Sequence, residues 1–495
     1  MPYILAIDQG TSSTKTILFD EGGKSVHKAT EPLRSVYLDG NRVEQDPEEI
    51  YQNVLTSVRK CLDGFAANGG DLAQIKACGI SNQRETFVIW DETGKPLHPA
   101  IVWQCKRSVA VCERLEKKGF GTKINEKTGL IIDPYFSGTK VIWLYENEPT
   151  VREAIDQGRA FFGTIDSWLL FRLTQGQSYL TDYTNASRTL FFNLKELAWD
   201  RELLADFGLS KLNLPEAKPS SYHFGHSNLD GLLDQEISIS ALIGDSHAAA
   251  FGEGCFEPGG AKATLGTGSS ILMNIGKELK TSKTGMVTTI CWSTEDRVDY
   301  ALEGIIVSAG ATIEWVKNQL GLFENPSELE QICLSLPDNG GVYIVPAFSG
   351  LGAPHWDMNR KASIEGLSFD STKSHIIRAA VESIPYQIKD VVVAMEADSG
   401  TTLTELKVDG GITANRFVLQ FLADLLQRKV ITIGIADVSA LGAAYLAGLN
   451  SKVYESIDQL RSFNQNFIST LPGKDSEKVA GYYKGWKKVI GNKNT

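Results

Sequence analysis

Cysteine is scarce in this sequence, and its distribution excludes two kinds of structure. The chain has 495 residues and only 7 cysteines, at positions 61, 78, 105, 112, 255, 291 and 333. Because they are odd in number, scattered and never arranged as C-x-x-C, neither a disulfide framework nor a cysteine zinc site is expected. We expect each to be a buried, reduced side chain.

Long apolar runs and an excess of basic residues are also missing. No hydrophobic stretch approaches the length of a transmembrane helix, and the N-terminus, MPYILAIDQG, has no signal-peptide pattern. The net charge of -11 argues against nucleic acid or an anionic membrane as the main partner. We therefore predict a cytoplasmic protein, without membrane insertion, that acts on a small molecule.

Strand-like and helix-like segments alternate along the chain, which indicates an α/β fold. Two apolar runs within residues 3–19 flank the polar turn DQGTSST, and residues 259–276 repeat this layout, so we predict two related lobes. Residues 46–65 read as a helix that an aspartate caps. We place the domain boundary in FGEGCFEPGG, giving domains 1–253 and 254–495.

The stretch GDSHAAA, residues 244–250, sets an aspartate, a serine and a histidine side by side. It resembles the G-x-S-x-G turn of nucleophilic hydrolases, but an alanine replaces the second glycine. Consecutive side chains point in different directions, so Asp245, Ser246 and His247 cannot relay a proton among themselves. This stretch alone therefore does not predict a hydrolase.

Three turns have the composition of phosphate-binding turns. They are DQGTSSTK (residues 8–15), GTGS (266–269) and DGG (409–411), in which glycines allow close approach and hydroxyls or amides can face phosphate. The alternative for each is an ordinary polar turn. No G-x-x-x-x-G-K-[ST] occurs, which excludes a P-loop nucleotide site.

Two further clusters have a functional and a structural interpretation. Arg84 beside Glu85, at a strand end, suits a polyhydroxylated ligand because one donates hydrogen bonds and the other accepts them. The alternative is a surface ion pair. His223 and His226 could suggest a metal, but no further ligand cluster accompanies them, so we expect a polar loop.

Ordered blocks along nearly the whole chain resemble the FGGY family of carbohydrate kinases, and within it the glycerol kinases. They include AIDQGTSSTK, GISNQRET, AIVWQCKR, GTIDSWLLFRLT, TDYTNASRTLFFN, GCFEPGGAKATLGTG, LEGIIVSAGATIEW, PAFSGLGAPHWD, VDGGITANRF and ALGAAYLAGL. The resemblance implies two actin-like (ribonuclease H-like) domains around a central cleft, with the polyol held mainly by residues 1–253 and ATP mainly by 254–495. It implies phosphorylation of a primary hydroxyl with ATP and Mg²⁺, and we expect a homo-oligomer, a dimer or tetramer.

The resemblance also assigns roles residue by residue. The catalytic base would be Asp245, and the polyol would contact Arg84, Glu85, Trp103, Tyr135, Ser246 and Ser270. The nucleotide would contact Thr11, Ser12, Ser13, Lys15, Gly266, Thr267, Gly310, Glu314, Gly411 and Asn415. Asp8, through water, and Asp245 would hold Mg²⁺. Glu314 stands where a glutamine is usual.

The pocket departs from the family pattern at three positions. Glycerol kinases usually have G-D-Q-Q where this chain has Gly-Asp-Ser246-His247, and a phenylalanine where it has Ser270. Loss of an aromatic ring leaves space for extra hydroxyl-bearing carbons or water. Glycerol is the predicted substrate, and a tetritol, pentitol or pentulose is the alternative. A third possibility is an actin-like or chaperone-like ATPase without a small-molecule substrate.

Overall fold

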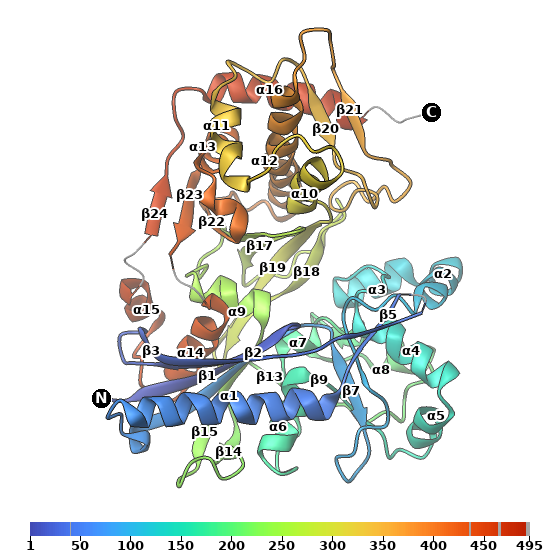
Figure 1. Cartoon of the computed structure of the whole chain (residues 1–495). Helices are drawn as coiled ribbons and strands as arrows, with labels where there is room; N and C mark the ends of the chain where they lie inside the picture. The colour runs from blue at the N-terminus through green and yellow to red at the C-terminus, as the bar shows by residue number, and fades with distance from the viewer. Residues whose placement is uncertain (40, 435–436, 464–466, 492–495) are drawn as a thin grey trace.

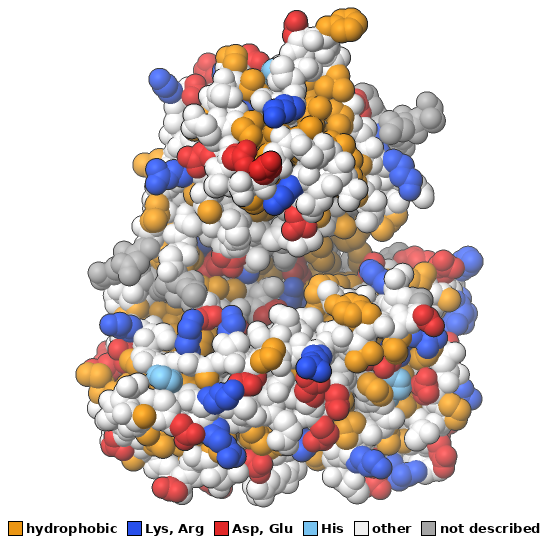
Figure 2. All heavy atoms as spheres, viewed as in Figure 1, with side chains coloured by type: hydrophobic (Ala, Val, Ile, Leu, Met, Phe, Trp, Pro, Cys, Tyr) orange, Lys and Arg blue, Asp and Glu red, His pale blue; other side chains and the backbone are white. Residues whose placement is uncertain are grey.

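Two α/β lobes make up the molecule and lie one above the other in Figure 1. The computed structural model describes residues 1–495 except 40, 435–436, 464–466 and 492–495. Figure 2 shows a hollow between the lobes, with acidic and basic side chains on its walls. No helix of the described part of the chain is both long and apolar enough to cross a membrane.

The first lobe is built around a six-stranded sheet in the order β14-β15-β6-β1-β2-β3. Its strands are β1 (Tyr3–Gln9), β2 (Ser13–Phe19), β3 (Ser25–Pro32), β6 (Ile75–Asn82), β14 (Ser221–Ser227) and β15 (Ile237–Gly244). A five-stranded sheet contains β4 (Val36–Leu38), β5 (Arg42–Gln45), β7 (Phe87–Trp90), β8 (Ala100–Ile101) and β9 (Phe161–Thr164). Two small pairs are β10 (Leu180–Asp182) with β13 (Glu216–Lys218), and β11 (Phe192–Asn193) with β12 (Ala198–Trp199).

Nine helices belong to this part of the described chain. They are α1 (Pro47–Ala67), α2 (Val109–Lys117), α3 (Phe120–Thr128), α4 (Ser137–Asn147), α5 (Pro149–Asp156), α6 (Ile165–Leu173), α7 (Tyr183–Ala186), α8 (Arg201–Asp206) and α9 (Asp245–Gly252), with a 3-10 turn, η1 (Leu72–Gln74). The predicted helix at 46–65 is confirmed as α1, where the Asp46 side chain accepts a hydrogen bond from the Glu48 amide.

The second lobe is built around a seven-stranded sheet in the order β18-β19-β17-β16-β22-β23-β24. Its strands are β16 (Gly260–Leu265), β17 (Ser269–Gly276), β18 (Val287–Thr294), β19 (Arg297–Ile306), β22 (Glu405–Asp409), β23 (Lys429–Ile433) and β24 (Phe467–Thr470), beside the pair β20 (Tyr343–Val345) and β21 (Ser363–Glu365). Its helices are α10 (Gly310–Asn318), α11 (Leu329–Leu334), α12 (Lys373–Ser399), α13 (Arg416–Leu426) and α16 (Ser476–Gly491), with η2 (Pro326–Glu328) and η3 (Gly411–Ala414).

Both sheets contain the same five-strand arrangement. In the first lobe β3, β2 and β1 are antiparallel neighbours, and β6 and β15 continue the sheet parallel to β1. In the second lobe β19, β17 and β16 are antiparallel, and β22 and β23 continue parallel to β16. The prediction of two related lobes, each opening on a hairpin, is therefore confirmed.

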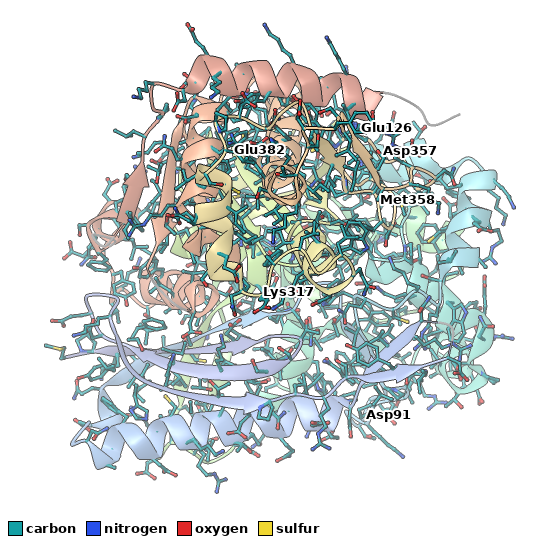
Figure 3. The ribbon with its side chains drawn as sticks, turned by 45° about the horizontal axis from the view of Figure 1, so that its top comes forward. Asp91, Glu126, Lys317, Asp357, Met358 and Glu382 are labelled. Carbon is teal, nitrogen blue, oxygen red and sulfur yellow. The ribbon has the colours of Figure 1, made fainter. Side chains whose placement is uncertain are left out.

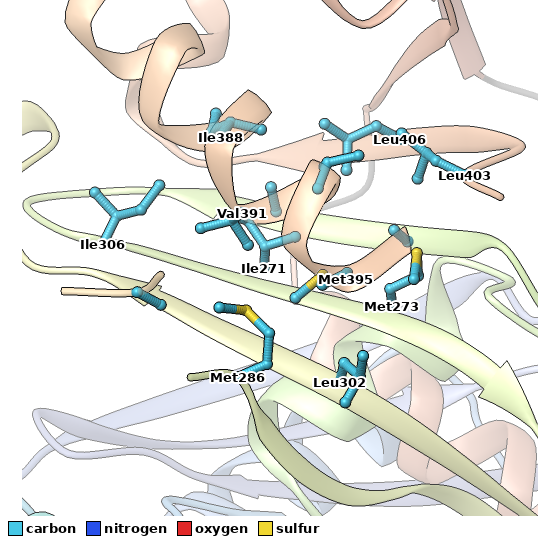
Figure 4. Close-up of a cluster of buried hydrophobic side chains, with 14 of the residues drawn as sticks. Ile271, Met273, Met286, Leu302, Ile306, Ile388, Val391, Met395, Leu403 and Leu406 are labelled. Atoms are coloured by element: carbon cyan, nitrogen blue, oxygen red, sulfur yellow. The ribbon is translucent and has the colours of Figure 1, made fainter. Parts of the chain in front are cut away.

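Apolar helices cover the sheets. In the second lobe α12 lays Ile388, Val391 and Met395 against β17 and β19, as Figure 4 shows. In the first lobe α1 covers one face of the sheet and α14 (Val438–Asn450) contacts β6, β1 and β15. Helix α15 (Ile457–Phe463) follows, and Leu460 belongs to the same buried cluster as α14.

Helix α14 lies late in the chain but packs on the sheet of the first lobe. The chain therefore passes from the first lobe to the second and then returns to the first. The stretch where we placed the boundary lies between the end of α9 at Gly252 and the start of β16 at Gly260. The division 1–253 and 254–495 stays a prediction for the folding units.

Candidate active site

Three parallel strands of the first lobe end at one edge of the sheet. Gln9 of β1, Asn82 of β6 and Gly244 of β15 lie side by side in the register. The residues at these ends include Asp8, Arg84, Glu85 and Asp245, which are far apart in sequence. In open α/β sheets, ligands bind at the carboxyl ends of parallel strands, so this edge is the candidate polyol site.

Arg84 and Glu85 are buried at this edge rather than paired on the surface. Their relative exposures are 5% and 1%, and they do not pair with each other: Arg84 Nη2 donates to Glu303 Oε1 at 2.9 Å, while Glu85 Oε1 accepts from Arg188 Nε at 2.5 Å. Glu85 has φ of +61°, a strained conformation for a non-glycine residue that is common at functional sites.

Asp245 is the first residue of α9, directly after β15. Arg84 Nε lies 3.3 Å from its Oδ1, and the Ser246 amide donates to the same oxygen at 2.6 Å. The side chain is 37% exposed, and within the described chain neither contact uses Oδ2. A side chain added at Gly244 would meet Arg84 Cγ at 2.7 Å, so the glycine leaves room for the arginine to reach Asp245.

Two aromatic side chains lie beside these charges. The rings of Trp103 and Tyr135 are 5.6 Å apart and nearly perpendicular. Burial raises the pKa of Tyr135 far above its usual range, so its phenol keeps the proton. Trp103 Nε1 donates to Thr11 Oγ1 at 2.9 Å, which links the predicted polyol side to the predicted phosphate turn.

Lys140, which was not predicted as a site residue, is hydrogen-bonded to the backbone at Tyr135. The side chain is fully buried, and its Nζ donates to the carbonyls of Pro134 and Tyr135 at 2.9 and 2.7 Å. Burial lowers the pKa of Lys140 to about 8, although Glu85 opposes this shift. The ammonium fixes the backbone that carries the tyrosine.

Arg188 and Glu303 are two further site residues that the sequence analysis missed. Both are buried, and Arg188 Nη1 lies 2.7 Å from Glu303 Oε2. Glu303 is on β19 of the second lobe, where Ser270 Oγ of β17 also donates to its Oε1 at 2.8 Å. Burial disfavours the charged form of Glu303, but Arg188 and Arg84 outweigh it and hold the pKa far below its usual range.

His247, the neighbour of Ser246, lies beneath the site rather than in it. Its side chain is fully buried, and burial, with Arg84 nearby, lowers its pKa well below the usual value. Its Nε2 is 3.5 Å from Thr289 Oγ1, and its Nδ1 has no hydrogen-bond partner among the described residues. His247 is therefore a buried, neutral ring between Thr289 and the Gly244 backbone.

The predicted phosphate turn of the first lobe joins β1 to β2 and contains Thr11 and Ser12, while Ser13 begins β2. Lys15 Nζ donates to Asp437 Oδ1 at 2.7 Å, so the lysine is held by the residue that caps α14. The Thr11 carbonyl accepts a hydrogen bond from Gln45 Nε2 at 2.7 Å. These contacts fix the turn from two sides.

In the second lobe, β16 and β22 are parallel neighbours, so the turns after them lie at one edge. Gly310, the first residue of α10, donates its amide to the Gly266 carbonyl, and the Ala309 and Ala311 amides donate to the Thr267 carbonyl. Gly411 opens the turn after β22. The predicted nucleotide residues Gly266, Thr267, Gly310 and Gly411 are thus brought together, largely as backbone.

Asn415 and Glu314 have more local surroundings. The Asn415 side chain caps α13 by accepting from the Val418 amide at 3.3 Å, and Glu314 is an exposed residue of α10. Glu314 lies one turn along α10 from Gly310, and Asn415 follows η3, which Gly411 opens.

Asp8 and Asp245 form a carboxylate pair that fits a hydrated Mg²⁺. Burial, and then the nearby Asp245 carboxylate, raise the pKa of Asp8 to about 6, and a cation beside the two carboxylates would favour their charged forms. Ser81 Oγ donates to Asp8 at 3.0 Å. No group of three or more metal-ligating side chains occurs in the described ranges, as expected where Mg²⁺ takes one or two carboxylates plus water and phosphate.

The prediction that His223 and His226 lie in a polar loop was wrong. Both lie on strand β14, at the edge of the first sheet, rather than in a loop. Their rings are 4.6 Å apart, and His223 Nδ1 is 2.8 Å from Ser238 Oγ of β15.

The repeated sheet topology, the charged strand ends and the opposing glycine turns define a two-lobed, actin-like phosphotransferase. Residues 3–252 match the N-terminal domain, and residues 261–451 the C-terminal domain, of the FGGY family of carbohydrate kinases. The chain belongs to this family and is a carbohydrate or polyol kinase.

Similar proteins cover nearly the whole chain. A glycerol kinase of Symbiobacterium thermophilum is 46% identical and one of Thermoanaerobacter pseudethanolicus 45% identical, over 99% of this chain and 97% and 98% of theirs. The crystal structure of Plasmodium falciparum glycerol kinase with ADP superposes with a TM-score of 0.94 at 36% identity, covering 99% of this chain and 98% of that chain. The alternative of an ATPase without a small-molecule substrate is therefore not supported.

Proposed function

We propose that this chain transfers the γ-phosphoryl group of ATP to a primary hydroxyl of glycerol. The observation that carries the proposal is the convergence of Arg84, Glu85 and Asp245 at one sheet edge, beside Trp103 and Tyr135. Relatives named glycerol kinase that match over 97% or more of their length support glycerol as the substrate.

Each side chain has a role in this proposal. Arg84 would donate to a hydroxyl oxygen, since its Nη1 has no hydrogen-bond partner in the described chain. Asp245 would accept the proton of the attacking hydroxyl through Oδ2, which neither of its contacts in the described chain uses, a contribution of about 10²–10⁴-fold. Trp103 would pack against the carbon chain. Phosphoryl transfer needs mainly such positioning and charge stabilisation.

The phosphates would lie between the two sets of turns. Lys15 and the hydroxyls of Thr11, Ser12 and Ser13 would face them from the first lobe, and the turns at Gly266 and Gly411 from the second. Asp8 and Asp245 would hold Mg²⁺, which neutralises charge that develops on the phosphates. The cytoplasmic location and the homo-oligomer stay predictions.

A longer polyol or ketose is the second candidate, and Ser270 favours it. This half-buried serine uses its hydroxyl on Glu303 and leaves no aromatic ring at the position. An added hydroxyl-bearing carbon could occupy such a space and bond to the donors around it.

A coupled assay of ADP release separates these candidates. It compares kcat/KM for glycerol, dihydroxyacetone, erythritol, threitol, ribitol, xylitol, ribulose and xylulose. We expect the highest value for glycerol. A longer substrate that exceeds glycerol at least tenfold would replace glycerol, and no activity on any of them would contradict the proposal.

A further inference from the structure

A row of alternating charges runs through the candidate polyol site and crosses from one lobe to the other. In order it contains Glu85, Arg188, Glu303, Arg84 and Asp245, with neighbouring members 2.5, 2.7, 2.9 and 3.3 Å apart. Every member except Glu303 comes from the first lobe. Glu303 is therefore the carboxylate that joins the row across the lobe interface.

Burial makes this carboxylate necessary for the arginines. Arg84, Arg188 and Glu303 are 5%, 0% and 1% exposed, and a buried charge without a partner is strongly unfavourable. Glu303 contacts both guanidinium groups, one through each oxygen. Without it, Arg188 would keep Glu85, whereas Arg84 would keep only the half-exposed Asp245 as an ion-pair partner among the described residues.

Glu303 also fixes the direction of Arg84. The guanidinium is held by Nη2 on Glu303 and by Nε near Asp245, which leaves Nη1 as the donor without a partner in the described chain. A planar guanidinium held at two nitrogens cannot rotate, so the orientation of Nη1 is set. Ser270, two residues along β17 from the cross-strand neighbour of Glu303, holds the carboxylate in turn.

We infer that Glu303 is a positioning residue for the polyol: from the second lobe, it aims Arg84 of the first lobe at the substrate hydroxyls. The inference rests on the proposed polyol kinase function. It follows that the polyol site is complete only while β19 lies against the first lobe, so a change in lobe arrangement would change polyol affinity through Glu303.

The chain offers a matched control for the loss of a buried ion pair. Glu382 and Arg378 of α12 are buried and 2.7 Å apart, and Glu382, labelled in Figure 3, lies in the helical part of the second lobe. Both Glu382→Gln and Glu303→Gln remove a buried carboxylate that pairs with arginine. Glu382 pairs with one arginine and lies away from the polyol site, whereas Glu303 pairs with two.

The experiment measures KM for glycerol and for ATP, together with the melting temperature. For Glu303→Gln we expect KM for glycerol to rise about 30-fold or more, since unpairing a buried charge at a binding site has effects of this size, with KM for ATP changed less than about twofold. Glu303→Asp, which keeps the charge, should recover part of the affinity. Glu382→Gln should lower the melting temperature and leave KM for glycerol unchanged.

A double-mutant cycle decides whether Glu303 acts through Arg84. If it does, Arg84→Gln with Glu303→Gln should have the same KM for glycerol as Arg84→Gln alone. Additive effects, or an unchanged KM in Glu303→Gln, would overturn the inference while leaving the proposed function standing. If Glu303→Gln does not fold, Glu303→Asp takes its place in the cycle. Wild-type protein inactive on every polyol would overturn both.

Discussion

The two lobes share a sheet topology but equip the ends of corresponding strands differently. At the ends of β6 and β15, the first lobe carries charged side chains, Arg84, Glu85 and Asp245. At the ends of β16 and β22, the second lobe carries glycine turns, the first of which is hydrogen-bonded through its backbone to the start of α10. The first lobe thus presents charged side chains to a ligand, and the second presents glycine turns whose backbone a ligand can approach closely.

This difference follows from what each candidate ligand requires. A small polyol has only hydroxyl groups, so it needs directed donors and acceptors, and these must be buried and paired to be held still. The phosphates of ATP form a chain of anionic groups, and successive backbone amides at turns can donate hydrogen bonds to such groups. We therefore expect mutations in the two lobes to affect different kinetic constants. Side-chain changes in the first lobe should alter kcat or KM for the polyol, and backbone changes in the second should alter KM for ATP.

The largest effect is expected in the first lobe, for Asp245→Asn. The amide keeps the size of the side chain but cannot accept the substrate proton, so kcat should fall about 10²–10⁴-fold. The fold should survive, because Asp245 is 37% exposed and contributes little packing. ADP-release kinetics measure the loss, and calorimetry should find ATP still bound.

Near-normal turnover in Asp245→Asn would show that another group accepts the proton. Ser246→Ala is the matched control, since its backbone amide, which donates to Asp245, remains. We expect that variant to keep its kcat within about threefold, because its hydroxyl, a predicted polyol contact, affects KM for the polyol and takes no part in the proton transfer.

In the second lobe the sharpest change is Gly310→Ala. An added Cβ would lie 2.7 Å from the Gly266 carbonyl oxygen, so α10 must move away from the turn that we propose binds phosphate. KM for ATP should rise about tenfold, since small misplacements of a binding element have large effects, while KM for glycerol stays the same. An equal rise in both would contradict the division by lobe.

Gly481→Ala is the control for that variant. It lies in α16 of the same lobe, and an added Cβ there meets no atom within 4 Å. Both Michaelis constants should be unchanged, and the melting temperature should rise slightly because alanine favours a helix over glycine.

The sequence predicts the first lobe's local features well and the contacts between lobes poorly. Arg84 and Glu85 stand out because they follow an apolar strand closely, a pattern visible within a few residues. Asp245 stands in a conspicuous stretch, GDSHAAA, but only the family resemblance gives it a role. Arg188 and Glu303 do not, because their partners are distant in the chain and no local spacing reveals them. Both occur in blocks that carry the family resemblance, SRTLFFN and LEGIIVSAG, which is the signal that could have found them.

Asp437 and Lys140 were missed, and the histidines of β14 were assigned to a loop, for related reasons. Asp437 meets Lys15 only because α14 returns to the first sheet. Lys140 is a lysine in an apolar helix, which a sequence pattern places on a surface. For His223 and His226, the strand signal in SYHFGHS is weak, because Gly225 and polar residues interrupt the apolar positions.

A smaller effect is expected for Ser270→Phe, which tests how far the second lobe shapes the polyol pocket. The ring would fill the space beside Glu303 and remove the hydroxyl that donates to it. We expect activity on tetritols and pentitols to fall about tenfold relative to glycerol. Ser270→Ala, which removes the hydroxyl without filling the space, should leave this ratio unchanged, and an equal loss in both variants would assign the effect to the hydroxyl.

The smallest effect concerns Glu253, the counterpart to Glu303 as a buried carboxylate between the lobes. Glu253 is 1% exposed, and the Asp409 carboxyl lies within hydrogen-bonding reach of it. Burial, with Asp409 nearby and Lys262 opposing, raises its pKa to about 8. The folded state therefore binds this proton more tightly than the unfolded state, so the stability that the group contributes falls as pH rises from about 4.5 to 8.

Glu253→Gln removes this ionisation, so its stability relative to the wild type should increase as the pH rises across the same range. At pH 8.5 we expect the variant to be more stable by about 1–3 kcal/mol, and at pH 5 the two should be nearly equal. Urea unfolding at both pH values measures the difference, with the exposed Glu278→Gln as control. A variant that loses stability at pH 8.5 would show that Glu253 is ionised and paired, as Glu303 is, and would remove the contrast between the two carboxylates.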